Sequence, residues 1–357
     1  MQTETLEIEI ENFKQNWAKN NEVYGLDEPF PDYVLDVADK VKHFMVPENR
    51  KYQGALGNAK GMIDAVLEYS NAATDITDSG KFFDNVNVIF DFLLKVRMTS
   101  QVPLNTVFFI MQKLKKLNPE SMDIDTLKRV LEDECQFHLN NYAVARSKIA
   151  KHMSARIIDR CEEYEQSNIV IGTHCHSGAV VESLINSKDY INYVVVSKTE
   201  PEQQGVITAK ELLDAGIKVK FIAMEQYSVE FRRVNMFLFG IDAVSVEGIV
   251  LNKTGTRMIA TLAHTKELPV YFLGETYKYA RDTLYGGLIH SERREVTNHL
   301  LANHLGIDLQ QYLDAGLLNA QFTAFDTTKP EFYNSIVSEQ GFMPMPDAFE
   351  KEWRNYL

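Results

Sequence analysis

The sequence has few cysteines, too little positive charge to balance its acidic residues, and no long hydrophobic run. Its three cysteines, Cys135, Cys161 and Cys175, form no Cys-x-x-Cys pair, so neither a disulfide framework nor a cysteine zinc site is expected. Lysine and arginine number 37 against 50 acidic residues, a net charge of −13, which disfavours broad binding to nucleic acid or to an anionic membrane. No stretch approaches the roughly 18 consecutive apolar residues of a membrane span. The acidic N-terminus has no signal-like apolar run, and the prediction is a cytoplasmic protein.

The composition is 45% hydrophobic and 24% charged, which is typical of a globular protein with a large core. The length of 357 residues favours two domains. Apolar residues recur at helix spacing in four stretches of the N-terminal half, residues 34–41, 62–67, 86–96 and 123–163. We therefore predict a helical N-terminal domain over residues 1–165 and a second domain over residues 166–357.

Short apolar runs, rich in β-branched and aromatic residues, follow from residue 168 onward. They span residues 169–172, 193–196, 219–223, 236–240 and 270–274. Runs of this kind are typical of parallel strands that are buried on both faces. Helical patterns separate most of them, including a capping-box pattern from Thr208 to Glu211 that is predicted to open a helix. The alternation predicts an α/β fold with a Rossmann-like, doubly wound, mostly parallel sheet. The stretch after about Asp314 is expected to be loop-rich.

Cys175 lies where the first predicted strand ends. Ligands of open α/β sheets bind beyond the carboxyl ends of the strands, and a helix N-terminus near Gly178 is expected to favour the thiolate. Cys175 is therefore a candidate functional cysteine, and a small buried packing residue is the alternative. Its neighbours His174 and His176 suggest a metal site, but adjacent residues of an extended chain point to opposite sides, so we expect no metal here.

Polar residues also follow the fourth and fifth predicted strands. Asp242 comes directly after the fourth strand, where capping of the next turn is the more common role. Lys253 precedes a predicted helix whose N-terminus suits a phosphate, although Asn252 stands before it where a P-loop has glycine. Lys278 follows the fifth strand. Either lysine is compatible with plain solvation, but three such positions at consecutive strand ends favour a site for a small anionic molecule.

Five blocks at these positions resemble one family. They are Thr173-His-Cys-His-Ser177, Thr199 to Leu212, Gly240-Ile-Asp242, Leu251-Asn-Lys-Thr-Gly-Thr256 and Gly274-Glu-Thr-Tyr-Lys278. Further matches are Gln53-Gly-Ala55, Arg97-Met-Thr99, Phe325 to Phe332 and Glu339 to Phe342. The family contains ribose-1,5-bisphosphate isomerase, methylthioribose-1-phosphate isomerase and regulatory subunits of translation initiation factor 2B. The resemblance extends over about residues 45–345.

The resemblance implies a helical domain followed by a Rossmann-like domain, and an isomerase whose chemistry depends on Cys175 and Asp242. The Glu-Thr-Tyr-Lys block resembles the ribose-1,5-bisphosphate branch more closely. We expect Asp242 to protonate the ring oxygen of an aldose 1-phosphate and the Cys175 thiolate to take the proton from C2. The implied substrate-binding residues are Gln53, Gly54, Ala55, Arg97, Ser177, Gln204, Asn252, Lys253 and Lys278. No organic cofactor or metal is implied.

Three residues depart from the family pattern. Gln53 replaces an arginine, Glu200 replaces the arginine of a Glu-Thr-Arg-Pro block, and Glu247 replaces an asparagine. Losing positive charge weakens charge-assisted contacts to phosphate. A bisphosphate is therefore disfavoured, and a substrate with one phosphate or with a different group at its far end stays open.

Three hypotheses follow. The first is an aldose–ketose isomerase acting on a ribose 1-phosphate-type sugar, most like ribose 1,5-bisphosphate. The second is a non-catalytic protein that senses a sugar phosphate or a nucleotide, like the alpha subunit of initiation factor 2B. The third is an oligomeric scaffold that binds no sugar phosphate. The resemblance implies a homodimer or a homohexamer in each case.

Overall fold

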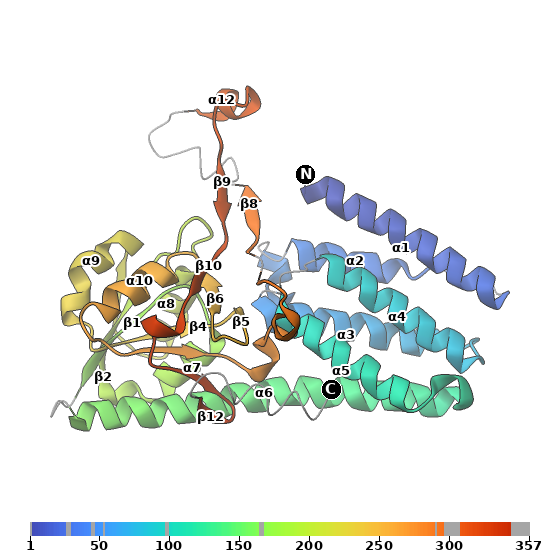
Figure 1. The fold of residues 1–357 in the computed structure, drawn as a ribbon, viewed down its shortest axis with the longest axis horizontal. Helices are drawn as coiled ribbons and strands as arrows, with labels where there is room; N and C mark the ends of the chain where they lie inside the picture. The colour runs from blue at the N-terminus through green and yellow to red at the C-terminus, as the bar shows by residue number, and fades with distance from the viewer. Residues whose placement is uncertain are drawn as a thin grey trace. The chain divides into compact units, whose positions relative to one another are not determined.

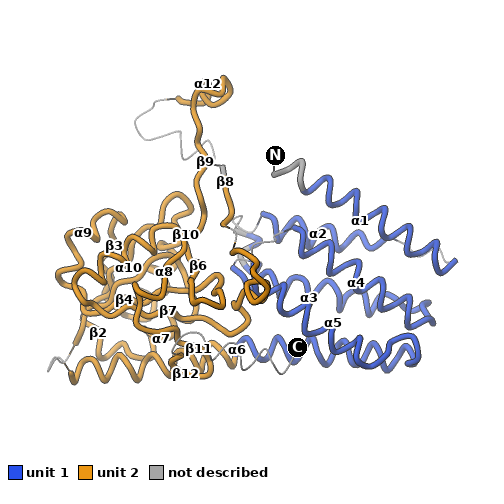
Figure 2. The backbone as a smooth tube through the Cα atoms, in the orientation of Figure 1, with its two compact units in different colours: residues 1–143, 356 blue, residues 144–355, 357 orange. Residues whose placement is uncertain are grey.

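The computed structural model describes residues 2–25, 30–43, 47–52, 54–96, 100–163, 168–289, 291–295 and 308–343. The chain forms two compact units, residues 1–143 with 356 and residues 144–355 with 357 (Figure 2). The first unit is helical, and the second combines strands and helices (Figure 1).

Helices α2 (Asp32–Lys42), α3 (Gly54–Ala72), α4 (Ser79–Val96) and α6 (Ile124–Glu163) correspond to the four stretches of apolar spacing predicted from the sequence. The described residues also form α1 (Gln2–Tyr24) and α5 (Gln101–Lys116), which none of the predicted stretches includes. In α2 the buried residues Val34, Val37, Ala38 and Val41 form one stripe, because positions three and four apart share a helix face. Stripes of this kind bury α1 against α4, where the Phe13 and Phe92 rings stack with their centroids 4.4 Å apart.

The long helix predicted over residues 123–163 is confirmed as the 40-residue helix α6. It contributes to both compact units, because the first unit ends at Ala143. The domain division after residue 165 stays a prediction. In the described part of the chain, no helix is both long enough and apolar enough to cross a membrane.

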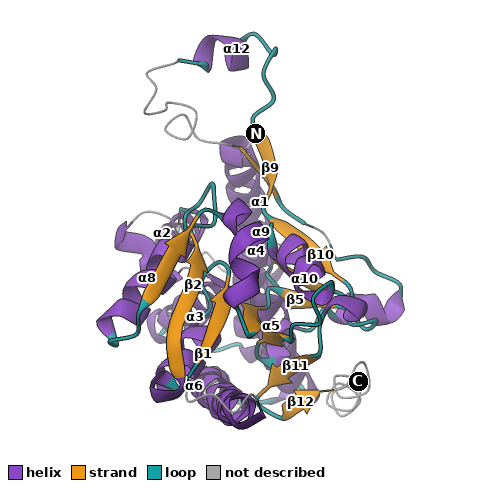
Figure 3. Cartoon of the chain, turned by 90° about the vertical axis from the view of Figure 1, so that its left-hand side faces the viewer, coloured by secondary structure: helices purple, strands orange, loops and turns teal. Residues whose placement is uncertain are grey.

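A seven-stranded sheet forms the centre of the second unit, so the predicted α/β fold is confirmed. Its strands are β1 (Ile169–Thr173), β2 (Ile191–Ser197), β3 (Val219–Ile222), β4 (Met236–Gly240), β7 (Val270–Leu273), β11 (Ser335–Ser338) and β12 (Gly341–Met343). The order is β12-β11-β7-β4-β1-β2-β3, and every neighbouring pair is parallel except β11 with β12. Figure 3 shows β1 and β2 side by side.

Both faces of the central part of this sheet are covered, which explains why β1, β4 and β7 are mostly apolar and buried at every position. In β4, Met236 and Leu238 join a core that contains Ile157 of α6 and Leu184 of α7 (Gly178–Asn186). The alternate residues Phe237 and Phe239 face the other side, because neighbouring residues of a strand point to opposite faces. There the Phe237 ring meets that of Tyr227 in α9 (Tyr227–Glu230), with centroids 5.5 Å apart.

The expectation of a loop-rich segment after Asp314 is wrong. That segment contains β9 (Gln321–Thr323), β10 (Phe325–Thr328) and the sheet strands β11 and β12. β10 pairs with β6 (Val250–Lys253), which also pairs with β5 (Ala243–Val244), and β9 pairs with β8 (Arg293–Glu295). Strands β9 to β12 have only three or four residues each, and β9, β10 and β11 pair with β8, β6 and β7, which lie far away in the sequence. Local periodicity therefore carries little signal for them.

The predicted capping box at Thr208 is also wrong. Helix α8 (Gly205–Asp214) begins three residues earlier, at Gly205, where a Cβ would lie 1.8 Å from the Ser197 carbonyl oxygen. The Thr208 hydroxyl instead donates to the Cys175 carbonyl oxygen at 2.9 Å. The remaining α-helices among the described residues are α10 (Thr256–His264) and α12 (Gln310–Asp314).

Candidate functional site

Cys175 and Asp242 follow adjacent strands at the centre of the seven-stranded sheet. Cys175 comes after β1 and Asp242 after β4, and these two strands are parallel neighbours. The chain leaves β1 for β2 on one side and later returns to place β4 on the other side. Such a reversal of strand order opens a crevice where α/β proteins bind ligands.

The backbone of Cys175 is strained and held by two threonines. Its φ is +67°, a left-handed conformation that typically costs a non-glycine residue about 1–3 kcal/mol and clusters at functional sites. The Cys175 amide donates to the Thr199 hydroxyl at 2.9 Å, and the Cys175 carbonyl accepts from Thr208. Because the Thr199 hydroxyl donates its own hydrogen to the Ser197 carbonyl at 3.0 Å, this anchor is fully hydrogen-bonded.

The Cys175 thiol is buried and neutral. It donates to Gln204 Oε1 at 2.9 Å. Burial raises the pKa of the thiol to about 12; the positive charge of Lys253 opposes this rise, and the charges of Asp242 and Glu202 add to it. The prediction of a thiolate is therefore wrong for the free site, because loss of solvation outweighs any effect of the nearby helix N-terminus.

Asp242 is within electrostatic reach of that thiol, since its charge contributes to the raised pKa of Cys175. Its amide donates to the Leu251 carbonyl oxygen at 2.9 Å, which ties the end of β4 to β6. Ser177 lies next to the last residue of β4, because a Cβ built on Gly240 would come within 2.7 Å of the Ser177 Cβ. The residues after β1 and β4 therefore meet at one edge of the sheet.

His174 and His176, the sequence neighbours of Cys175, contact different partners. His174 Nε2 lies 2.9 Å from the Thr254 carbonyl oxygen, which can only accept, so this nitrogen carries the hydrogen. Nδ1 then accepts from the Ser197 hydroxyl at 2.6 Å. Burial lowers the pKa of His174 to about 4, so the ring is neutral. His176 Nε2 lies 3.3 Å from a Glu211 carboxylate oxygen.

Lys253 belongs to a buried cluster of charges. Its ammonium pairs with Glu202, and the other Glu202 oxygen accepts from the Arg294 guanidinium. Arg294 also contacts Glu292 at 2.7 Å. Lys253 Nζ lies 4.7 Å from the centre of the Phe325 ring, a cation–π distance. The next residue towards the N-terminus, Asn252, donates from its buried amide to the Thr256 hydroxyl at 3.0 Å.

Lys278 is likewise paired with a carboxylate. Its Nζ lies 3.3 Å from Glu275 Oε2, and both side chains are largely buried. A Cβ built on Gly274 would lie 3.2 Å from Lys278 Cδ and 2.9 Å from Ile241 Cβ. The stem of Lys278 therefore passes close to the residue that precedes Asp242.

The N-terminus of α10, which was expected to suit a phosphate, is occupied by an acidic side chain. Asp326 Oδ2 accepts from the Gly255 amide at 2.7 Å, and Oδ1 accepts from the Arg257 amide at 3.1 Å. The carboxylate comes from β10, far away in the sequence. A phosphate bound to these amides would have to displace it, so the expectation of an open anion site at this helix end is wrong.

The upstream candidates belong to the first unit. Gly54, with φ +71°, and Ala55 begin α3. Gln53 and Arg97 lie outside the described residues. Their part in substrate binding stays a prediction, as do the binding roles of the residues in the second unit.

Sequence reasoning missed four residues that hold the site together: Thr199, Glu202, Thr208 and Arg294. The first three fall inside the block from Thr199 to Leu212. Their polar character could be read from the sequence, but the residues that they bond to could not. Arg294 lies more than ninety residues from Glu202, and no local pattern links the two.

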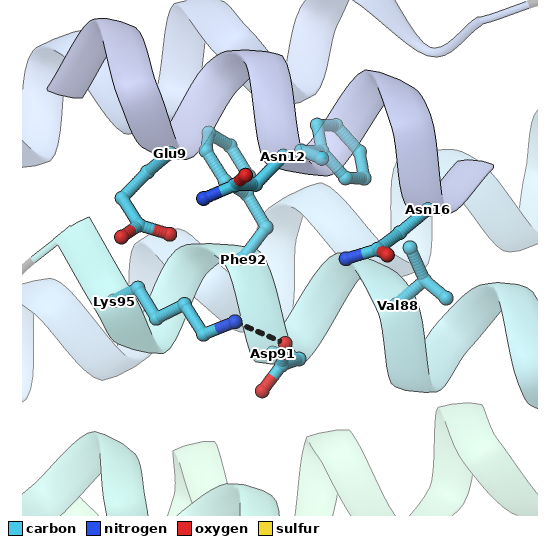
Figure 4. Close-up of a pocket in the computed structure, with 8 residues that line it drawn as sticks. Glu9, Asn12, Asn16, Val88, Asp91, Phe92 and Lys95 are labelled. Atoms are coloured by element: carbon cyan, nitrogen blue, oxygen red, sulfur yellow. Dashed lines mark hydrogen bonds and ion pairs between the residues drawn. The ribbon is translucent and has the colours of Figure 1, made fainter. Parts of the chain in front are cut away.

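One surface pocket lies in the first unit, between α1 and α4 (Figure 4). Asn12, Asn16 and Glu9 line it from α1, and Lys95 pairs with Asp91 on α4 at 2.8 Å. It has room for about one water molecule, too little for a sugar phosphate. None of the candidate site residues lines it.

The chain is similar to known proteins over most of its length. The chain is 27% identical over 315 residues to the ribose 1,5-bisphosphate isomerase of Thermococcus kodakarensis, covering 87% of this chain and 91% of that protein. It is similar in fold to the translation initiation factor eIF-2B structure from Pyrococcus horikoshii, with a TM-score of 0.69, 21% identity and coverage of 90% and 100% of the two chains. For 5-methylthioribose 1-phosphate isomerase from the same organism the TM-score is 0.66, with 20% identity and coverage of 90% and 87%.

A family model described as the initiation factor 2 subunit family matches residues 52–345. This match extends over part of each compact unit and includes every residue of the second unit that is discussed above. The chain therefore belongs to the initiation factor 2 subunit family.

Proposed function

We propose that this protein is an aldose–ketose isomerase that converts a ribose 1-phosphate-type sugar, such as ribose 1,5-bisphosphate, to the corresponding 1-phospho-ketose. The observation that supports this most directly is the Cys175 thiol, which is held in a strained backbone, bonded to Gln204 and within electrostatic reach of Asp242. A packing cysteine would need none of these features. The similarity to ribose 1,5-bisphosphate isomerases adds to this support.

The chemistry requires one acid and one base on the same sugar. Phosphate on the anomeric oxygen blocks spontaneous ring opening. A base removes the C2 proton, and the electron pair of the broken C2–H bond forms the C1–C2 double bond. At the same time the bond from C1 to the ring oxygen breaks, and the ring oxygen takes a proton from the acid. C1 of the resulting enol then gains a proton while the C2 hydroxyl loses one, which yields the ketose.

The free site favours Cys175 as the acid and Asp242 as the base, the reverse of the roles expected from the sequence. With a thiol pKa of about 12, Cys175 carries a proton that it can donate to the ring oxygen. Asp242 is then the group that takes the C2 proton. A positioned acid and a positioned base contribute about 10²- to 10⁴-fold each.

The remaining candidate residues would bind the substrate. Asn252, Ser177 and Gln204 suit sugar hydroxyls, and Lys253 and Lys278 suit phosphate once they exchange a carboxylate partner for it. Arg97 and the segment Gln53-Gly54-Ala55 complete the proposed set. We further propose that the protein works as a homodimer or homohexamer.

The test is incubation with ribose 1,5-bisphosphate, methylthioribose 1-phosphate and simple pentose 1-phosphates, followed by an assay for ketose. We expect product from at least one sugar, and none from Cys175→Ser or Asp242→Asn. Cys161→Ser is the matched control, because Cys161 is a buried core thiol of the same unit. Normal rates in both site variants, with intact folds, would refute the assignment.

A non-catalytic sugar-phosphate or nucleotide sensor is the second candidate. The observation in its favour is that Lys253 and Lys278 are each paired with a carboxylate in the ligand-free protein, an arrangement suited to a ligand-dependent exchange of partners. It predicts thermal stabilisation by a sugar phosphate or a nucleotide with no product formed from any of the sugars.

A further inference from the structure

We propose that Glu202 is a specificity-determining residue: its carboxylate fills one anion position between Lys253 and Arg294, so that the site prefers a sugar with a single phosphate over a bisphosphate. The inference rests on the isomerase function proposed above and narrows its substrate class.

The three side chains form a closed arrangement of charges. The Lys253, Glu202 and Arg294 side chains are 4%, 10% and 9% exposed. One Glu202 oxygen faces each cation, which is how a phosphate would use two of its oxygens. The Phe325 ring lies against both cations, 4.7 Å from Lys253 Nζ and 5.4 Å from Arg294 Cζ. The cluster is therefore a buried two-cation site whose anion is supplied by the protein.

The cluster borders the candidate reaction centre. The charges of Lys253 and Glu202 both act on the Cys175 thiol. Two residues after Glu202, Gln204 accepts the thiol hydrogen bond. A substrate seated against Cys175 would thus meet the loop that carries Glu202, and a phosphate aimed at Lys253 would meet the carboxylate first.

Charge accounting gives the direction of the preference. Among the described residues, the printed ion pairs join two positive charges, Lys253 and Arg294, to two negative charges, Glu202 and Glu292. A second phosphate would add negative charge where these four charges already balance, in surroundings where repulsion is only weakly screened. Replacing Glu202 with glutamine would leave one net positive charge for that phosphate.

Glu200, two positions earlier, offers a matched comparison, because its charge was also expected from the sequence to disfavour a bisphosphate. Glu200 carries the same charge on the same loop, but its side chain is 54% exposed and pairs with Lys198 at 2.6 Å. Glu200→Gln removes an equal charge without touching the cluster. A general electrostatic effect would change both variants alike, whereas the proposal requires a change in Glu202→Gln alone.

The first experiment measures kcat/KM for ribose 1,5-bisphosphate and for ribose 1-phosphate in wild type, Glu202→Gln and Glu200→Gln. Wild type and Glu200→Gln are expected to prefer the monophosphate. In Glu202→Gln the ratio should shift towards the bisphosphate by about tenfold or more, as for a gained charge-assisted contact. Equal ratios in the two variants would overturn the proposal.

The second experiment needs no turnover. Inorganic phosphate, added at constant ionic strength, should raise the melting temperature of Glu202→Ala more than that of wild type or Glu200→Ala, because removal of the Glu202 side chain leaves the position between Lys253 and Arg294 open to phosphate. If no sugar is turned over by any variant, the isomerase proposal fails while this measurement still tests the anion position. A melting temperature of Glu202→Ala that responds to phosphate no more than that of wild type argues against the anion position.

A folding defect is also informative. If Glu202→Ala unfolds without phosphate and folds when phosphate is added, the proposal stands. If it stays unfolded in phosphate while Glu202→Asp folds, Glu202 is a structural carboxylate that no small anion replaces, and the proposal is wrong.

Discussion

At the residue scale, the protonation of Cys175 decides which group can start the reaction. Helix N-termini and lysines lower a thiol pKa, and burial raises it. Here Cys175 is 8% exposed and burial has the larger effect on its pKa. The proton therefore stays on sulfur in the ligand-free site.

This protonation predicts a flat alkaline arm in the pH profile of turnover. With a thiol pKa of about 12, kcat/KM should stay level between about pH 7 and pH 10, because the acid remains protonated throughout. If a thiolate were the base, kcat/KM would rise about tenfold for each pH unit over this range. A profile of kcat/KM against pH, with stability checked at each end, separates the two.

His174 predicts a pH dependence of stability. Burial lowers its pKa to about 4 from the ordinary 6.5, so between these values the unfolded chain binds more protons than the folded one. Above about pH 6.5 the imidazole is neutral in both states and costs no stability. As the pH falls towards 4, the unfolded state binds a proton that the buried ring does not, so the free energy of unfolding decreases. The difference of 2.5 pKa units corresponds to about 3 kcal/mol.

Urea titrations at several pH values check this prediction. His174→Gln should be less stable than wild type at pH 8 and should show a smaller loss between about pH 6.5 and pH 4. His138 also has a pKa lowered to about 4 by burial. His138→Gln should therefore reduce the pH dependence of the unfolding free energy independently of His174→Gln. An unchanged slope in His174→Gln contradicts the prediction.

At the element scale, the N-terminus of α10 is capped by a side chain from a strand far away in the sequence. Gly255, with φ +107°, turns the chain into the helix, and Asp326 of β10 accepts from the first amides. The same carboxylate complements the positive end of the helix dipole. The cap thus links the small antiparallel sheet to a helix that covers the large one.

Removing this cap should destabilise the protein. Asp326→Ala is expected to lower the free energy of unfolding by about 1–2 kcal/mol. Asp326→Asn, which keeps one side-chain oxygen, should lose less and serves as the control. Equal stability of Asp326→Ala and wild type in denaturant titrations would show that the cap contributes nothing measurable.

The helices and strands differ in how well local sequence patterns predict them. The strands of five residues or so, such as β1 and β4, and the helices α2 and α6 were predictable, because apolar periodicity is a property of the local chain. Strands β9 to β12 and the start of α8 were not. They depend on a partner strand or on contact with Ser197, which no window of neighbouring residues contains.

At the scale of the whole molecule, the proposed homo-oligomer requires an apolar surface that is exposed on a single chain and buried when chains assemble. Leu213 of α8, Phe221 of the edge strand β3 and Val229 of α9 have exposures of 57%, 45% and 61%. Large exposed apolar residues on neighbouring elements are common at subunit interfaces. The edge of β3 is also open to pairing in the described sheet.

Light scattering of the purified protein tests this proposal. The expected mass is two or six times the 40.9 kDa of one chain. Phe221→Glu should lower it, because a charge would be buried at the contact. A mass of one chain at micromolar concentration would contradict the proposed assembly.

The fold class, many of the strands and helices, and the family could be predicted from the sequence. These follow from local periodicity and from blocks of neighbouring residues, and both survive without knowledge of long-range contacts. Tertiary structure alone decided the neutral state of Cys175, the pairing of Lys253 with Glu202 and Arg294, and the acidic cap on α10. Burial and electrostatic pairing depend on which distant groups meet in space, and only the folded chain specifies that.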